Sequence, residues 1–184
     1  MAPIPTDIRL SHPTPIFVKI TAMNNNTALT SAALLQQWQG HRSLTRRVIE
    51  AFPEKELFDF SVGGMRPFAQ LAQEMIGMTY PGVRGVATND WSMNDGPEYD
   101  VLPATKAELL RRWDVVTERI NDFWTRIPEG RFQERTLAFE RYEGSVHGIL
   151  FYIIDNEIHH RGQGYVYLRV LGIEPPPFWD RPMG

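Results

Sequence analysis

Residues 155–163 read Asp155-Asn156-Glu157-Ile158-His159-His160-Arg161-Gly162-Gln163. They lie near the C-terminus, inside an otherwise apolar helical stretch from Val146 to Leu171. Polar groups on a buried helix need partners, because an unsatisfied buried polar group costs roughly 1–3 kcal/mol. Imidazole, amide and carboxylate groups at this density therefore either build a site or solvate one face of the helix.

One face of this helix is identified by stepping three or four residues at a time. Its members are Val146, Ile149, Ile153, Asn156, His160, Gln163 and Tyr167. Most of them are apolar, so we expect this face to be buried, with Asn156 and His160 pointing toward the core one turn apart. That i, i+4 spacing lets two side chains reach one metal ion.

The other two histidines of this helix have different expected positions. His159 lies about 100° around the helix from His160, on the same side as Asp155 and Tyr152. We expect His159 to be more exposed or to contact another subunit. His147 lies near one edge of the buried face, too far along the helix to join His160 directly.

Hydrophobic periodicity predicts four long helices. Their approximate ranges are 30–51, 67–80, 105–127 and 144–171. Pro53 ends the first, Pro67 is a favoured first-turn residue for the second, and a capping box from Thr105 to Glu108 begins the third. Gly172 and the following prolines end the fourth. Four amphipathic helices of this length predict an all-α four-helix bundle.

The remaining segments connect or flank these helices. We expect a loop over 58–65, a long connection over 81–103 that is rich in Gly, Asp, Asn and Pro, and a brief strand over 136–139. Long connections in compact domains are often functional or mobile. The expected organisation is an N-terminal extension over 1–29, a helical domain over 30–177 and a C-terminal tail over 178–184.

The second predicted helix carries a carboxylate on or beside its apolar stripe. Glu74 follows Leu71 by three residues and precedes Met78 by four, and an isolated buried charge is strongly disfavoured. If the second and fourth helices face each other, Glu74, Asn156 and His160 converge on a site that suits a divalent metal and a bound water. The alternative is structural, with Glu74 and Asn156 simply hydrogen-bonding His160.

Composition excludes several classes of function. The chain has 184 residues, a formal net charge of -3 and no cysteine, and its pI is about 6.0. The absence of cysteine excludes a disulfide framework and thiolate metal ligands, and it fits a cytoplasmic protein. A nucleic-acid partner would need a basic patch, and a membrane helix would need about 20 apolar residues. We expect neither partner.

Several motifs resemble those of the DinB (DinB/YfiT-like) family. They are His159-His160-Arg161-Gly162-Gln163, Tyr167-Leu168-Arg169, Gly172, Pro175-Pro176, the segment from Gly64 to Ala72, Asp59-Phe60, and Thr105 to Leu110 with Trp113. The similarity covers roughly 34–177. It implies a four-helix bundle in an up-down-down-up arrangement and a frequent homodimer.

The resemblance also implies a divalent metal, often nickel or zinc, held by three histidines. One lies late in the second helix, and the other two form a His-x-x-x-His pair on the fourth, whose last member opens His-Arg-Gly-Gln. This chain departs at two of the three positions. Glu74 stands where the first histidine is expected and Asn156 where the second is expected, and only His160 matches. A Glu/Asn/His set would bind a hard or borderline ion more weakly than three imidazoles.

Two functions follow from this reading. The first is an enzyme in which nickel, zinc or manganese at Glu74, Asn156 and His160 activates a low-molecular-weight thiol or water, as a thiol S-transferase or hydrolase. The family resemblance links such proteins to stress and DNA-damage responses. The alternative is a non-catalytic binding or structural dimer on a DinB scaffold whose metal site is degenerate.

We assign no catalytic or binding role to two further sets of residues. The tryptophans Trp91, Trp124 and Trp179 are each compatible with core, pocket wall or interface. Arg161 and Gln163 are expected to anchor helix packing or the dimer. A pair between Arg161 and Glu157 at i, i+4 would contribute about 0.3–0.5 kcal/mol if exposed.

Overall fold

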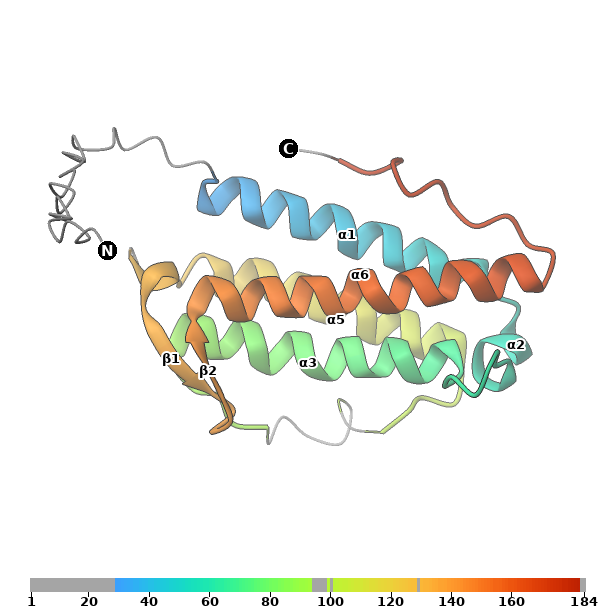
Figure 1. The fold of residues 1–184 in the computed structure, drawn as a ribbon, viewed down its shortest axis with the longest axis horizontal. Coiled ribbons are helices and arrows are strands. Elements are labelled where there is room, and N and C mark those ends of the chain that lie inside the picture. The colour runs from blue at the N-terminus through green and yellow to red at the C-terminus, as the bar shows by residue number, and fades with distance from the viewer. Residues whose placement is uncertain (1–28, 94–98, 100, 129, 183–184) are drawn as a thin grey trace, which may run out of the picture.

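Four long helices lie side by side in the computed structural model, which describes residues 29–93, 99, 101–128 and 130–182 (Figure 1). They are α1 (Ser31–Ala51), α3 (Phe68–Thr88), α5 (Lys106–Trp124) and α6 (Val146–Val170). The shorter elements are α2 (Glu54–Asp59), η1 (Arg131–Gln133), β1 (Arg135–Ala138) and β2 (Tyr142–Ser145). The described residues are thus mostly helical, as predicted. The structure also contains a small two-stranded sheet, so it is not all-α as predicted.

Side-chain caps begin three of the long helices at or near their predicted starts. The Thr30 hydroxyl accepts from the Ala33 amide, and the Thr105 hydroxyl accepts from the Glu108 amide. The Ser145 hydroxyl accepts from the Gly148 amide at the start of α6. Such caps satisfy backbone donors that the first helical turn leaves free. The helix expected from 144 begins at Val146 because Gly144 and Ser145 belong to β2.

The end predicted for the second helix, near Tyr80, is wrong. Helix α3 continues through Pro81 to Thr88, and Asn89 ends it with a left-handed φ of 63°. Val83 and Val86, beyond the proline, are fully buried. Burying two such side chains stabilises by about 3–6 kcal/mol in total, which offsets the roughly 3 kcal/mol that an internal proline costs. The connection predicted over 81–103 is correspondingly shorter.

Three smaller boundaries also differ from prediction. Phe58 and Asp59, expected in a loop, close the short helix α2. Helix α5 ends at Trp124, before Ile127. The brief strand expected over 136–139 exists as β1, and it pairs antiparallel with β2 from Arg135↔Ser145 to Ala138↔Tyr142. Strand β2 was not expected, because Gly144 and exposed polar residues interrupt its apolar pattern.

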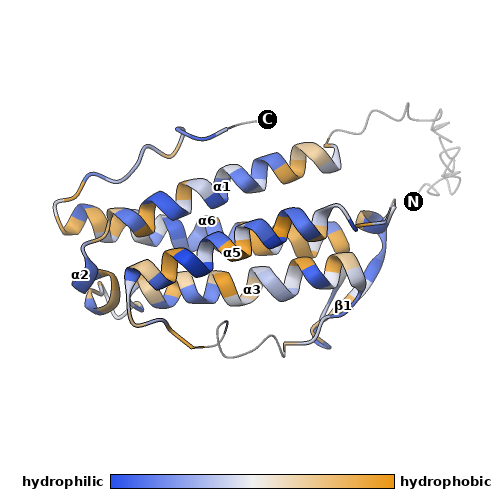
Figure 2. Ribbon diagram, turned by 180° about the vertical axis from the view of Figure 1, so that it is seen from behind, coloured by the Kyte–Doolittle hydropathy of each residue, from blue (hydrophilic) through white to orange (hydrophobic). Residues whose placement is uncertain are grey.

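The core divides into two clusters along the helices. The first contains Val48, Ile49, Phe52, Leu57, Phe68, Ala69, Leu71, Ala72, Met75, Ile76, Leu109, Trp113, Val116, Tyr167 and Leu168. The second contains Leu34, Trp38, Val83, Val86, Ile120, Trp124, Val146, Leu150, Ile153 and Ile154. Hydrophilic and hydrophobic residues alternate around α5 in the view from behind (Figure 2), as expected for a helix with one buried side.

Helix α6 packs against both α1 and α3. Two different sides of this helix are therefore buried, which explains why its polar residues need partners in two directions. The C-terminal segment runs back past α1 (Figure 1), where Arg47 pairs with Asp180 at 2.8 Å. Residues 1–28, most of the expected N-terminal extension, lie outside the described residues.

A glycine fixes how closely α6 approaches α3. A Cβ built on Gly164 would lie 2.5 Å from Cε2 of Phe68, whereas one built on Gly162 would meet no described atom within 4 Å. We expect Gly164→Ala to lower the free energy of unfolding by about 1–3 kcal/mol through overpacking. Gly162→Ala should raise it by about 0.5–1 kcal/mol through helix propensity. Urea denaturation of both variants tests this, and equal effects would contradict the close approach.

Candidate functional site

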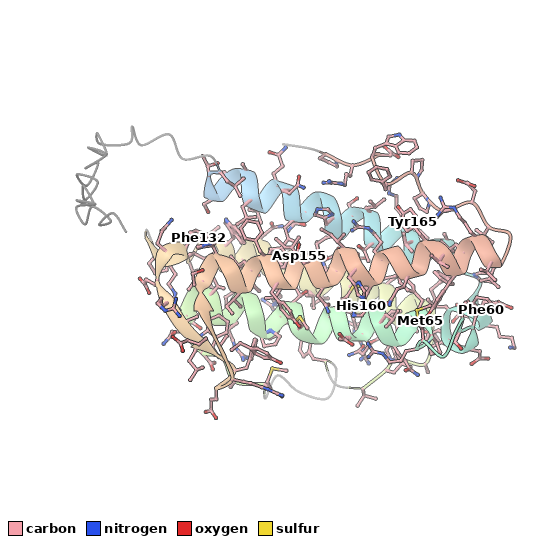
Figure 3. All side chains as sticks on the ribbon, viewed as in Figure 1. Phe60, Met65, Phe132, Asp155, His160 and Tyr165 are labelled. Atoms are coloured by element: carbon pink, nitrogen blue, oxygen red, sulfur yellow. The ribbon has the colours of Figure 1, made fainter. Side chains whose placement is uncertain are left out.

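Glu74, Asn156 and His160 converge between α3 and α6. The Nε2 atom of His160 lies 3.0 Å from Oε1 of Glu74, and Nδ2 of Asn156 donates to the same oxygen at 3.3 Å. His160 extends from α6 on the side that faces α3 (Figure 3). The three residues chosen from helical spacing thus share one carboxylate oxygen.

The second carboxylate oxygen of Glu74 is paired with an arginine side chain. Oε2 forms an ion pair with Arg66, which lies just before α3. Partial burial of Glu74 opposes its ionisation, but hydrogen bonds from Arg66, His160 and Asn156 outweigh it and lower the pKa of this carboxyl group. Glu74 is therefore an anion at neutral pH. Helical periodicity did not single out Arg66, because this residue precedes α3.

Gln163 orients the imidazole of His160. Its Oε1 lies 2.9 Å from Nδ1 of His160, and its Nε2 lies 3.5 Å from Nε2 of His159. With the ring proton on Nε2, His160 donates to Oε1 of Glu74. With the proton on Nδ1, it donates to Oε1 of Gln163 and leaves Nε2 free to bind a cation. This is the arrangement in which metal-binding histidines are usually held by a neighbouring acceptor.

The position of the Asn156 amide is one reason why this site could hold a hard or borderline metal ion. Oδ1 of Asn156 is buried and has no hydrogen-bond partner among the described residues. Turning over the amide would bring this oxygen toward the oxygen of Glu74 and Nε2 of His160, giving one nitrogen and two oxygen donors. No three His, Cys, Asp or Glu side chains gather in the described part of the chain, so a set of three protein donors here would include this amide.

Glu74 also borders a cavity of about 840 Å³. Its lining residues are Arg66, Gln70, Gln73, Glu74, Gly77, Met78, Met93, Tyr99, Ala138, Phe139, Arg141, Tyr142, Glu143, Gly144, Gly148, Ile149, Tyr152 and Ile153. They come mainly from α3, the β-hairpin and the start of α6. This volume lies within the range of small-molecule sites, roughly 300–1,000 Å³. The cavity therefore joins an apolar space to the polar group at Glu74.

Glu157 and Arg161 point toward α1 and not toward this site. Oε1 of Glu157 accepts from the Thr45 hydroxyl at 2.7 Å, and its Oε2 lies 3.5 Å from Nη1 of Arg42. Arg161 lies 3.9 Å from Glu157 and donates to Thr45 at 3.1 Å. Glu157 and Arg42 are almost fully buried. The expected i, i+4 pair exists, but it is one contact within a buried network and not an exposed pair.

His41 closes this network on α1. Nη2 of Arg161 lies 3.1 Å from Nδ1 of His41, so the ring accepts and is neutral. Burial, with the charges of Arg161 and Arg181, lowers the pKa of His41 from 6.5 to about 4. The unfolded chain therefore binds a proton near pH 6.5 that the folded chain binds only near pH 4.

This difference predicts a pH-dependent stability. Because the unfolded state holds more protons between pH 4 and 6.5, stability should fall by about 1–3 kcal/mol as the pH drops through that window. His41→Asn, which keeps an acceptor for Arg161, should flatten the dependence. His147→Asn is the control, since His147 is exposed and bonds the Phe132 carbonyl at 2.8 Å. Urea unfolding across this pH range measures the slopes, and identical slopes in all three proteins would refute the assignment.

The other residues singled out in the sequence have varied positions. His159 is exposed, as expected, and His147 is exposed rather than at the edge of a buried face. Trp124 is buried in the core and Trp179 is largely exposed. Trp91 packs closely over Gly85 on α3, where an added Cβ would lie 2.2 Å from the indole.

Comparison with known proteins agrees with the motifs and the fold. The sequence pattern of the DinB family matches residues 23–181, so the chain belongs to the DinB family. The solved structures of two DinB-like proteins are similar to this one. That from Bacillus subtilis has a TM-score of 0.66 and 18% identity over 80% of this chain and 97% of its own. That from Bacillus cereus has a TM-score of 0.63 and 16% identity over 78% and 94%.

No curated protein matches the chain. Among the described residues, none of the helices combines the length and the hydropathy needed to cross a bilayer. At identities under 20% the two solved relatives establish the fold alone.

Proposed function

We propose that this protein binds a divalent cation, nickel, zinc or manganese, at Glu74, Asn156 and His160, and a small molecule in the adjoining cavity. The supporting observations are that side chains of Asn156 and His160 meet at one carboxylate oxygen of Glu74, and that Oδ1 of Asn156 is buried and has no hydrogen-bond partner among the described residues. With its amide turned over, Asn156 would present this oxygen to a cation held by Glu74 and His160. Monodentate binding through Oε1 of Glu74 leaves Oε2 paired with Arg66.

The residues around this site have definable tasks. A cation there would lower the pKa of a bound water or thiol and so favour its nucleophilic form. Gln163 fixes the ring of His160. Arg66 balances the charge of Glu74. The cavity would hold the second reactant. The family resemblance supports a low-molecular-weight thiol as substrate and a thiol S-transferase or hydrolase as the activity.

The test is direct metal binding by the full chain. Protein stripped with a chelator should take up one equivalent of nickel, zinc or manganese, measured by titration calorimetry and by metal analysis after gel filtration. No uptake at millimolar metal would overturn the proposal.

A second candidate function is a metal-free binding protein. The observation that favours it is that Arg66, Asn156 and His160 already hydrogen-bond both oxygens of Glu74. Such a carboxylate needs no cation to be stable. Ligand binding in the cavity without metal uptake would favour this candidate over the first.

We also infer a homodimer built on an up-down-down-up bundle. The arrangement is supported by Figure 1, where α3 and α5 begin at the end that holds α2 and α6 begins at the other end. The dimer is supported by a stripe along the outer side of α6, where Phe151, Ile158 and Val166 are exposed at helical spacing. Val166→Lys should yield a monomer in sedimentation experiments. Leu137→Lys, which changes an exposed residue of strand β1 and not of α6, should not.

A further inference from the structure

The turn of the β-hairpin has an unusual backbone. Phe139 and Glu140 lie at its centre with φ values of 54° and 55°, and the Arg141 amide donates to the Ala138 carbonyl at 3.1 Å. Two successive positive φ values are characteristic of a type I′ turn, which Asn-Gly normally occupies. Residues with a bulky side chain are sterically disfavoured there. The sequence thus keeps an aromatic residue where the backbone disfavours one.

Phe139 differs from Glu140 in what it contacts. Phe139 lines the cavity, whereas Glu140 does not. The Phe139 ring meets the Trp91 ring edge-on, with centroids 5.4 Å apart, and Trp91 is itself packed closely over Gly85. The hairpin tip is therefore held to the end of α3 through two aromatic rings. Strained backbone positions of this kind cluster at binding sites.

The rest of the cavity is also aromatic and carries balanced charge. Tyr142 and Tyr152 line it with nearly parallel rings, 6.4 Å between centroids. Its two carboxylates are already paired, Glu74 with Arg66 and Glu143 with Arg135 from outside the lining. The other lining cation, Arg141, lies over the Tyr142 ring with its Cζ 5.8 Å from the centroid. The cavity has a volume of about 840 Å³. Its flat aromatic walls favour a flat ring over an aliphatic group of the same size, because two stacked aromatic rings attract each other more strongly than their buried area alone predicts.

We propose that the cavity binds a small molecule with a flat, uncharged aromatic body, and that Phe139 is the wall residue that determines this specificity. The proposal rests on the proposed function only in using the same cavity. It requires no cation. It gives a role to an aromatic side chain at a turn position whose backbone disfavours one.

The test compares two probes of similar size, naphthol and its hydrogenated analogue decahydronaphthol, by titration calorimetry. Naphthol should bind the full-length protein about 3–10-fold more tightly. Phe139→Asn keeps a residue that tolerates positive φ and should lower this preference by at least about threefold. Glu140→Asn makes the same exchange next to it, off the cavity, and should keep the preference unchanged. Phe139→Leu, which keeps bulk without a flat ring, should behave like Phe139→Asn.

The outcomes separate this inference from the metal proposal. Equal binding of the two probes, no binding of naphthol, or an unchanged preference in both Phe139 variants would overturn the role of Phe139. Cation uptake is measured on the same samples and should not change. Naphthol preference without cation uptake would overturn the metal proposal alone.

Discussion

Replacing Glu157 by glutamine should lower the free energy of unfolding by about 3–5 kcal/mol, the usual cost of removing one partner of a buried ion pair. The amide has nearly the same shape as the carboxylate and can still accept from the Thr45 hydroxyl. The decrease in the free energy of unfolding would therefore come from the missing charge and not from a cavity. Equilibrium urea denaturation at pH 7 measures it.

The size of this effect follows from the surroundings of Arg42. Its guanidinium is fully buried, and it lies 3.4 Å from the centroid of the Trp113 ring. It donates to the Thr117 hydroxyl at 3.0 Å and to the Trp113 carbonyl at 3.1 Å. Burial lowers the pKa of Arg42 to about 10, and the charge of Glu157 acts against this shift. Without Glu157, Arg42 and Arg161 would be two buried cations that have lost their shared carboxylate.

Glu143→Gln provides the matched control. Glu143 pairs with Arg135 at 2.9 Å, but both side chains are 71% exposed. An exposed pair contributes about 0–1 kcal/mol. A loss in Glu157→Gln no larger than in this control would show that the buried network contributes little to stability.

The sequence predicted which way Asn156 and His160 point from α6, but not that the neighbouring side of this helix is buried as well. Stepping by three and four residues selects Asn156 and His160 for one side, and that side does face Glu74. Glu157 and Arg161 lie about 100° further round. Arg161 is expected from the sequence to anchor helix packing or the dimer, with Glu157 as one partner, and it does contact His41 and Thr45 on α1. Because α6 packs on α1 as well as α3, this second side is also buried. Periodicity in one helix cannot reveal how many neighbours cover it.

The parts of the site that escaped prediction share a physical cause. Arg66 reaches Glu74 from the segment before α3, and the hairpin residues Phe139 and Tyr142 enter the cavity from a sheet of which only one strand was expected. Their positions depend on tertiary packing and not on the hydrophobic periodicity of one helix or strand. By contrast, Thr30 and Thr105 cap their helices as local capping rules predict.

Cation binding should depend on His160 and not on the adjacent His159. His160→Ala removes the single nitrogen donor of the proposed set, and we expect the affinity for nickel or zinc to fall by more than about 100-fold, beyond the effect of losing an outer hydrogen bond. His159→Ala changes an exposed ring and should leave affinity within about threefold, since its contact with Gln163 at 3.5 Å is long. Titration calorimetry of the two variants measures the difference.

Gln163→Leu separates a metal site from a purely structural pair. If Gln163 holds His160 ready for a cation, its loss should weaken binding by about 10–100-fold while His160 stays paired with Glu74. Glu74→Gln should abolish binding and leave Arg66 without its partner carboxylate. Should Gln163→Leu lower stability without changing metal affinity, the contact at 2.9 Å would support packing alone. Full affinity in Glu74→Gln would remove Glu74 from the ligand set, because the carboxylate is its only anionic donor.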